Sequence, residues 1–237
     1  MDGIELQKLR KSFFVSGKEK SVIKELPASL DPHKRIAILG KSGCGKTTLL
    51  RIIAGLEMAD SGERIVPDHL RIGYIFQEDR LFPWMTAAEN VAAVVREKQA
   101  SGTVTEAVLS MVGLQEFRDA YPHQLSGGMR KKVAFARCLA FQPDWIVMDE
   151  PFSALDYFER NRLQDELLAI LQKQSKGFLL VTHHVDEAMK LAEEVHIMRD
   201  GILAECFEIP QFSPEQIDSP EYVRIKKEIL NGCKNSI

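Results

Sequence analysis

The stretch with the clearest chemical potential is Gly40–Thr47, with the sequence Gly-Lys-Ser-Gly-Cys-Gly-Lys-Thr. The apolar run Arg35–Leu39 precedes it and the helix-forming run Thr48–Ala54 follows it. Glycines in such a turn can direct successive backbone N–H groups toward an anion, and the helix adds the positive end of its dipole. Strand, glycine-rich turn and helix in this order predict a phosphate-binding loop rather than a chance turn.

Two side chains at the end of this loop have distinct chemistry. Lys46 places a mobile cation where the β- and γ-phosphates of a nucleotide would lie. The Thr47 hydroxyl is a hard oxygen ligand suited to Mg²⁺. The loop therefore predicts binding of a nucleoside triphosphate together with magnesium.

Ionisable residues also follow two buried-strand patterns. Trp145–Met148 ends in Asp149 and Glu150, and Phe178–Thr182 ends in His183. The carboxyl ends of parallel strands carry the ligand sites of α/β sheets. An acid there suits Mg²⁺ held near phosphates, and a second acid could accept a proton from an attacking water. A histidine at that edge is either structural or in contact with phosphate.

The beginning of the chain reads as antiparallel β-structure. Residues 4–10 alternate apolar and polar, and Ser21–Ile23 follows a polar turn, which predicts two edge strands. Phe13 and Phe14 stand where we expect the first strand to end. Adjacent aromatic residues there can belong to the core, or Phe13 can stack on an adenine ring. Residues 57–71 are polar and predict a connecting loop.

The middle of the chain, residues 86–141, is almost wholly helical in pattern. We expect one helix over Ala87–Lys98 and another that begins at a capping box formed by Thr103 and Glu106. Helices without strands, inserted into an alternating β/α chain, predict a helical subdomain over about 86–141. The tail from about 205 to 237 reads as a peripheral extension with a helix over Pro220–Leu230.

Two further stretches admit both a functional and a structural interpretation. Ser126-Gly127-Gly128 predicts a helix N-terminus, and the cations Arg130–Lys132 in its first turn form either a solvated face or the surroundings of an anion. Asp79–Met85 places large apolar side chains in a turn. These side chains either bind a partner protein or pack on their own domain.

Composition narrows the class of protein. The 237 residues are 45% hydrophobic, enough for one large α/β domain, and the net charge of −3 argues against a general nucleic-acid surface. No apolar run approaches the ~18 residues of a spanning helix, and Met1–Glu5 has no signal-peptide pattern. The cysteines are scattered, without a disulfide or zinc pattern: Cys44, Cys138, Cys206 and Cys233. We expect a cytosolic chain that reaches a membrane only through other subunits.

Taken in order, these motifs resemble the ATP-binding-cassette (ABC) ATPase family over most of the chain. The resemblance rests on the phosphate loop, Gln77 after a strand, Leu125–Met129 in a helical insert, Ile146–Glu150 and Ser153–Asp156, together with Val181-Thr182-His183. It implies a P-loop NTPase core with a mostly parallel sheet, an antiparallel β subdomain and the helical subdomain, in a single domain over 1–237. It also implies a homodimer that sandwiches ATP and Mg²⁺ between the phosphate loop of one subunit and the signature motif, Leu125–Met129, of the other.

The resemblance also implies a role for each matching residue. Glu150 would polarise the attacking water, His183 would contact the γ-phosphate, and Asp156 would link the two sites of the dimer. Mg²⁺ would be bound by Thr47 and Gln77 with Asp149 behind. Phe13 would stack on adenine, and Ser126, Gly127 and Gly128 would close over the partner's nucleotide. The phosphates would be held by Gly40, Lys41, Ser42, Gly43, Cys44, Gly45, Lys46, Thr47 and Thr48.

Within the family, Phe76–Trp84 and Tyr121–Met129 are similar to the importer branch for nitrate, sulfonate, taurine and related small solutes. The resemblance implies transmembrane permease subunits that dock near Gln77–Trp84, an extracytoplasmic substrate-binding protein, and a place on the cytoplasmic face of the membrane. The chain departs from the usual pattern at Met129, at Lys131-Lys132 and at His184, and none of these changes removes a catalytic group.

The alternative is an exporter-associated or non-transport ABC ATPase. DNA-repair and translation members carry a long coiled-coil insert or two cassettes, which this sequence lacks, and its charge offers no nucleic-acid footprint. A P-loop GTPase would show an N-K-x-D motif, which is absent as well. The transported solute is not encoded in this chain, because other subunits select it.

Overall fold

The computed structural model describes residues 3–97 and 101–234. These residues form two compact units. Unit 1 comprises the described residues of 1–70 and 177–237, and unit 2 those of 71–176. No helix among the described residues combines the length and the apolar composition that a bilayer crossing requires.

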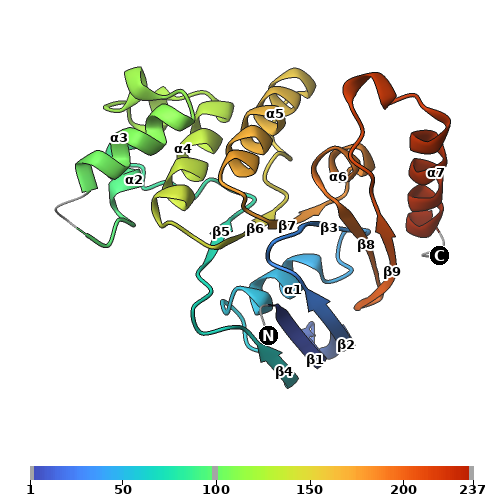
Figure 1. Cartoon of the computed structure of the whole chain (residues 1–237). Helices are drawn as coiled ribbons and strands as arrows, with labels where there is room; N and C mark the ends of the chain where they lie inside the picture. Colours follow the sequence, from blue (N-terminus) through green and yellow to red (C-terminus); the bar gives the residue numbers. More distant parts are fainter. Residues whose placement is uncertain (1–2, 98–100, 235–237) are drawn as a thin grey trace. The chain divides into compact units, whose positions relative to one another are not determined.

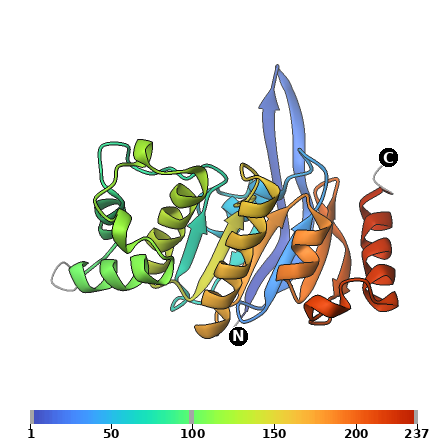
Figure 2. The ribbon, with the colours of Figure 1, turned by 90° about the horizontal axis from the view of Figure 1, so that it is seen from above.

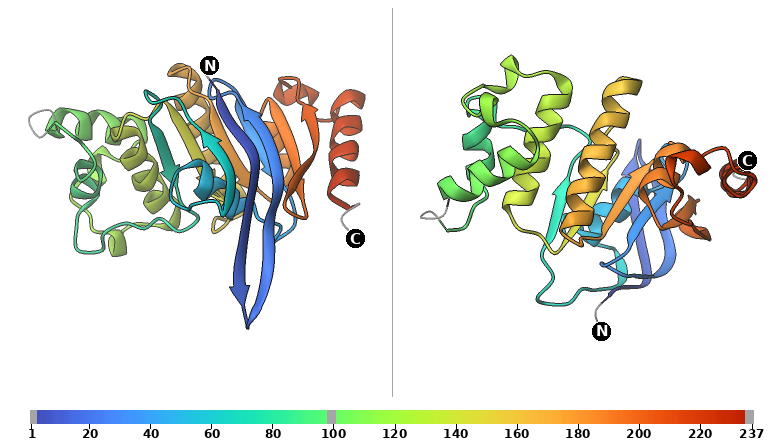
Figure 3. Two further views of the ribbon diagram at one scale, coloured as in Figure 1. Left: turned by 90° about the horizontal axis from the view of Figure 1, so that it is seen from below. Right: turned by 45° about the horizontal axis from the view of Figure 1, so that its top comes forward.

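Unit 1 contains an antiparallel sheet with the strand order β2–β1–β4 (Figure 1). These strands are β1 (Ile4–Val15), β2 (Lys18–Leu30) and β4 (Ser61–Ile65). Figure 3 shows the three strands side by side, and Figure 2 shows the turn end of the β1–β2 hairpin extending beyond the other elements of this unit. Buried Ile4, Leu6 and Leu9 anchor the other end of β1.

The second sheet of unit 1 has the order β7–β3–β8–β9. Its strands are β7 (Phe178–Thr182), β3 (Arg35–Leu39), β8 (Glu194–Arg199) and β9 (Ile202–Glu208). β3 is parallel to β7 and β8, whereas β9 pairs antiparallel with β8. All five residues of β3 and of β7 are buried, which is why both read as continuous apolar runs.

Helices complete unit 1. They are α1 (Lys46–Ile53), α6 (Val185–Leu191), the short 3-10 turn η3 (Pro214–Gln216) and α7 (Pro220–Lys234). α6 contacts β3 and β7, and α7 lies against α6 and β8. The expected C-terminal helix is therefore present, one turn longer than predicted.

Unit 2 contains the parallel pair β5 (Ile72–Ile75) and β6 (Trp145–Asp149) together with its helices. The helices are α2 (Ala87–Ala92), α3 (Ser101–Met111), η1 (Gln115–Phe117), η2 (Pro122–Gln124), α4 (Gly127–Ala140) and α5 (Tyr157–Lys173). α4 contacts α2, α3 and α5. The mostly parallel sheet and the separate antiparallel sheet confirm the predicted fold class.

Several boundaries differ from the prediction for β-structure. β1 and β2 are much longer than expected, and β1 is the central strand rather than an edge. β4 lies within the stretch predicted to be a loop, because its sequence Ser-Gly-Glu-Arg-Ile carries little apolar alternation. β1 continues through Val15, and Phe14 is 81% exposed, so the core interpretation of the two phenylalanines was wrong.

Two helix predictions were also wrong in detail. α2 ends at Ala92, where the β-branched Val94 and Val95 follow, and the expected end at Lys98 lies outside the described residues. α3 begins at Ser101, so Thr103 lies inside a helix and caps nothing. The capping box belongs instead to α2, where the Thr86 hydroxyl accepts from Glu89 N at 3.2 Å and Glu89 accepts from Thr86 N at 2.7 Å.

Candidate active site

The phosphate loop Gly40–Thr47 joins the end of β3 to α1 in unit 1. Gly43 and Gly45 have φ angles of +79° and +109°, which disfavour any other residue. A Cβ atom on Gly45 would lie 2.8 Å from the Val22 carbonyl oxygen, so the loop lies tightly against β2. No described atom lies within 4 Å of the corresponding position at Gly43, which faces open space. The loop is thus a backbone cradle that is open to a ligand.

Lys46 lies across this loop. Its side chain is buried, and Nζ donates to the carbonyl oxygens of Gly40 at 2.8 Å and Lys41 at 3.0 Å. The ammonium is therefore held at the cradle before any phosphate arrives. Cys44 is half-buried beside it, and burial raises the pKa of its thiol although Lys46 opposes the shift.

His183 belongs to the same edge of unit 1 as the phosphate loop. The parallel register pairs Leu39 of β3 with Thr182 of β7, so Gly40 and His183 are the next residues on two neighbouring strands. The His183 ring is exposed and lies 4.0 Å, centroid to centroid, from that of His184. His183 therefore lies at the carboxyl end of its strand, as predicted, on the strand next to the one that leads into the phosphate loop.

Phe13 lies on the hairpin above the loop rather than in the core. It pairs with Lys20 and is 37% exposed, with Lys11 Nζ at 5.2 Å from its ring centroid. Lys20 lies two residues before Val22 on β2, so about 7 Å of strand separates them. The Val22 carbonyl oxygen in turn lies against Gly45 of the phosphate loop. The exposed ring of Phe13 therefore belongs to the same hairpin that packs against the phosphate loop.

Unit 2 brings Gln77, Asp149 and Glu150 to one edge. Ile75 of β5 pairs with Met148 of β6, so Gln77 and the two acids follow paired residues. Asp149 is buried and accepts from the Tyr74 hydroxyl at 3.2 Å. Glu150 has a φ of +43°, a conformation that is strained for a residue with a side chain.

Two cations of α4, Lys131 and Arg137, bind the loop that contains Gln77. The sequence did not reveal this attachment. Lys131 is buried, donates to the Gln77 carbonyl oxygen and lies 2.9 Å from Asp79 Oδ1. Arg137 donates to the Asp79 carbonyl oxygen at 3.0 Å. Lys132 pairs with Glu166. Lys131 and Lys132 thus have acidic partners in their own chain, and the buried Lys131 is not part of a solvated face, whereas the anion interpretation stays a prediction.

The signature residues form the N-terminal end of α4, as predicted. The Ser126 hydroxyl caps the helix by accepting from Met129 N at 3.2 Å. Gly128 donates its backbone N–H to Glu159 Oε1 at 3.1 Å. Asp156 caps α5 through bonds from Phe158 N at 2.9 Å and Glu159 N at 3.0 Å. The contact with Glu159 was not foreseen, because no local pattern joins residues of two helices.

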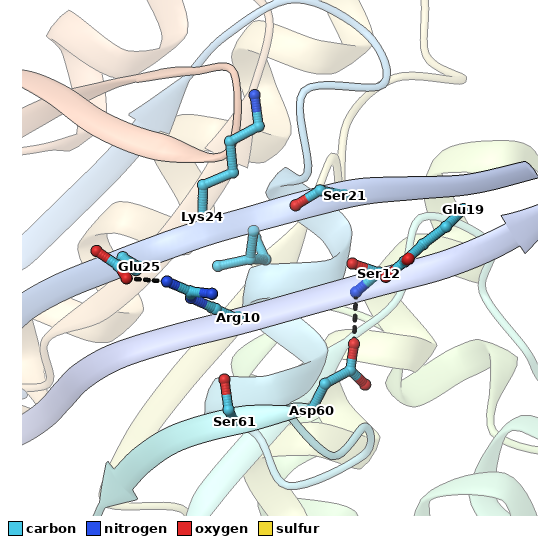
Figure 4. Close-up of a pocket in the computed structure, with 9 residues that line it drawn as sticks. Arg10, Ser12, Glu19, Ser21, Lys24, Glu25, Asp60 and Ser61 are labelled. Atoms are coloured by element: carbon cyan, nitrogen blue, oxygen red, sulfur yellow. Dashed lines mark hydrogen bonds and ion pairs between the residues drawn. The ribbon is translucent and has the colours of Figure 1, made fainter.

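A cavity of about 740 Å³ lies on the antiparallel sheet of unit 1 (Figure 4). Three of its charged side chains have partners: Arg10 pairs with Glu25, and Asp60 accepts from the backbone N–H of Ser12 at 2.6 Å. The residues that line it include none from Gly40–Thr47. We assign it no role in nucleotide binding.

A backbone cradle between a buried strand and a helix, with an acid pair at the end of another parallel strand, defines a P-loop nucleotide-hydrolysing protein. The sequence matches the ABC transporter family over residues 23–153, more than half of the chain. The chain therefore belongs to the ABC transporter ATP-binding family.

Individual relatives agree with this family. The chain is 38% identical to an ABC transporter ATP-binding protein of Methanocaldococcus jannaschii, over 99% of this chain and 92% of the relative. It is 36% identical to the aliphatic sulfonates import ATP-binding protein of Bacillus subtilis, over 93% of this chain and 90% of the relative. It is also 35% identical to a nitrate import ATP-binding protein of Synechococcus elongatus, over 91% of this chain and 36% of that longer protein.

A solved structure of similar fold is a dimeric ATP-binding cassette bound to ADP and Pi. Its TM-score is 0.78 at 26% identity, and the match covers 88% of this chain and all of the other. Like the other members of this family, the chain is an ATPase. The ion that usually accompanies ATP is Mg²⁺. The structure fits both ligands, because the Gly43–Gly45 cradle suits a polyphosphate. The donors Thr47, Gln77 and Asp149 all offer the oxygen atoms that Mg²⁺ prefers.

Proposed function

We propose that this chain hydrolyses ATP to drive import of a small sulfonate-, nitrate- or taurine-like solute across the cytoplasmic membrane. It would work as a homodimer on the cytoplasmic face, with separate permease subunits and an extracytoplasmic binding protein. Support comes from the import proteins among its relatives and the dimeric cassette it resembles. We propose that the chain is one ABC ATPase domain, with a helical subdomain over about 86–141 and an extension over about 205–237.

The residues of unit 1 would bind the nucleotide. Lys46 and the backbone N–H groups of Gly40–Thr48 would hold the β- and γ-phosphates, and the Thr47 hydroxyl would face the ion. Phe13 would stack on adenine, and His183 would donate to the γ-phosphate. Positioning and charge stabilisation of this kind supply most of the catalysis of phosphoryl transfer.

The residues of unit 2 would act on the same nucleotide. Gln77 and the buried Asp149 would orient the ion, and the Glu150 carboxylate would take the proton of the attacking water. Ser126, Gly127 and Gly128 would present the N-terminal end of α4 to the γ-phosphate on the second subunit, and Asp156 would link the two sites.

One observation carries the transport assignment: an apolar groove of about 390 Å³ beside the Gln77 loop, in unit 2. Its lining includes Phe76, Phe82, Val94 and Phe141. Trp84 is 69% exposed, and its ring lies 5.7 Å from that of Phe82, centroid to centroid. We propose that a short helix of the permease fills this groove, because exposed aromatic side chains around a hollow are typical of an interface.

Replacing Trp84 with Glu tests this proposal. The variant should lose co-purification with the permease subunits and solute uptake, while the basal ATPase of the isolated chain stays unchanged. Val223→Glu introduces the same charge at an exposed apolar residue of α7 and should preserve both. Normal co-purification and uptake with Trp84→Glu would contradict docking at this groove.

A further inference from the structure

We propose that the β8–β9 hairpin carries a binding site for a divalent transition metal, with Zn²⁺ the best fit, formed by Glu194, His196 and Cys206. The nucleotide chemistry uses none of these residues. The strands are antiparallel, and His196 pairs directly with Cys206, as Glu194 does with Glu208. Because alternate residues of a strand share a face, all four side chains lie on one face of the hairpin.

The donor atoms converge on one point. His196 Nε2 lies 2.6 Å from Glu194 Oε1 and 3.9 Å from Cys206 Sγ, and the three donors lie within 4.8 Å of one another. A nucleophilic Cys–His–acid arrangement would place the acid and the sulfur on opposite ring nitrogens. Here both approach the same nitrogen, which is the arrangement that a shared metal ion requires.

The distances fit a tetrahedral ion. Zn²⁺ lies about 2.0–2.3 Å from N, O and S ligands, which separates neighbouring donors by roughly 3.3–3.8 Å. The sulfur is already close to this distance from Nε2, and the carboxylate needs to withdraw by under about 1 Å. A water completes the fourth position.

The surroundings support the same site. Lys34 Nζ binds the other carboxylate oxygen, Glu194 Oε2, at 3.1 Å, which orients Oε1 toward His196. The side chains of His196 and Glu194 are only 12% and 16% exposed, so their positions are fixed, whereas Cys206 is exposed and gives access.

Metal titration of the full-length, nucleotide-free chain tests the proposal. With Zn²⁺ against a chromophoric chelator, we expect one ion per chain and an affinity that falls at least about 10-fold in Cys206→Ala and in His196→Gln. With Co²⁺, a thiolate-to-metal charge-transfer band should appear and should be absent from Cys206→Ala.

The thiol of Cys233 serves as the matched control. Cys233→Ala removes a half-buried thiol of α7 and should leave both the stoichiometry and the Co²⁺ band unchanged. Thermal melting of each variant shows whether it has folded. The proposal is overturned by binding that survives both hairpin substitutions, by binding that Cys233→Ala abolishes, or by no stoichiometric binding in the folded wild-type chain.

Discussion

Gly128, at the residue scale, shows a contact that bears on the proposed dimer. Its N–H, at the N-terminal end of α4, donates to the carboxylate of Glu159 in the same chain. A Cβ atom here would collide with Glu159, so a glycine is required for this approach. The carboxylate stabilises the helix end in the single chain, yet it would repel a phosphate presented there by a second subunit.

Replacing Glu159 with Gln should separate these two effects. The free energy of unfolding should fall, and the ATP concentration for half-maximal hydrolysis should fall about 2- to 5-fold, both reflecting roughly 0.3–1 kcal/mol for a charge at a helix N-terminus. Denaturant melts and ATPase titrations measure the two effects. Glu116→Gln, an equal change on an exposed turn of unit 2, should leave both unchanged. A rise in the ATP requirement would show that Glu159 assists closure.

At the scale of secondary-structure elements, side chains of α4 hold the Gln77 loop in place. Lys131 and Arg137 hold the backbone of the loop, and Lys131 also neutralises Asp79. The groove proposed for the permease is lined by residues of this same loop and helix, Asp79 and Arg137 among them. A movement of the permease segment bound in the groove would therefore be transmitted to the Gln77 loop through its contacts with α4.

Replacing Lys131 with Met should break this attachment. The change removes the closer of the two cations that pair with Asp79 and leaves Arg130 at 3.5 Å, so we expect unfolding to be easier by about 1–3 kcal/mol and the ATPase rate to fall with it. Denaturant unfolding and steady-state hydrolysis measure these changes. Lys173→Met, at an exposed position near the end of α5, is the control and should have little effect. Unchanged stability with Lys131→Met would show that the loop is held by its own packing.

At the scale of the whole molecule, the proposed dimer assembles the hydrolysis site, and Glu150 is its critical test. Glu150→Gln should keep ATP binding and lower turnover by at least about 100-fold, because the general base is lost. The unhydrolysed ATP should then trap a dimer in size-exclusion chromatography with light scattering. Glu221→Gln, on the exposed start of α7, should hydrolyse normally. Near-normal hydrolysis by Glu150→Gln would refute the base assignment, and lost hydrolysis without a dimer would refute the trapping.

The sequence predicted those parts of the site that depend on neighbours in the chain. The order of buried strand, glycines and helix around Gly40–Thr47 fixes the phosphate loop locally, and the apolar run before Asp149 marks a buried strand. Phe13 was ambiguous, because adjacent aromatic residues look alike in a core and on an exposed hairpin. β4 was missed because its few apolar residues give no periodic signal.

By itself the sequence therefore determined the phosphate loop, the acid pair at the end of β6 and the helix that begins at the signature, since local backbone preferences and periodicity encode each of them. Only the tertiary structure decided which distant side chains meet. Lys131 reaches Gln77 across 54 positions of the chain, Glu159 reaches Gly128 across 31, and Cys206 reaches His196 through strand register. Such contacts depend on helix packing and on register, and a one-residue slip would turn the hairpin donors to the opposite face.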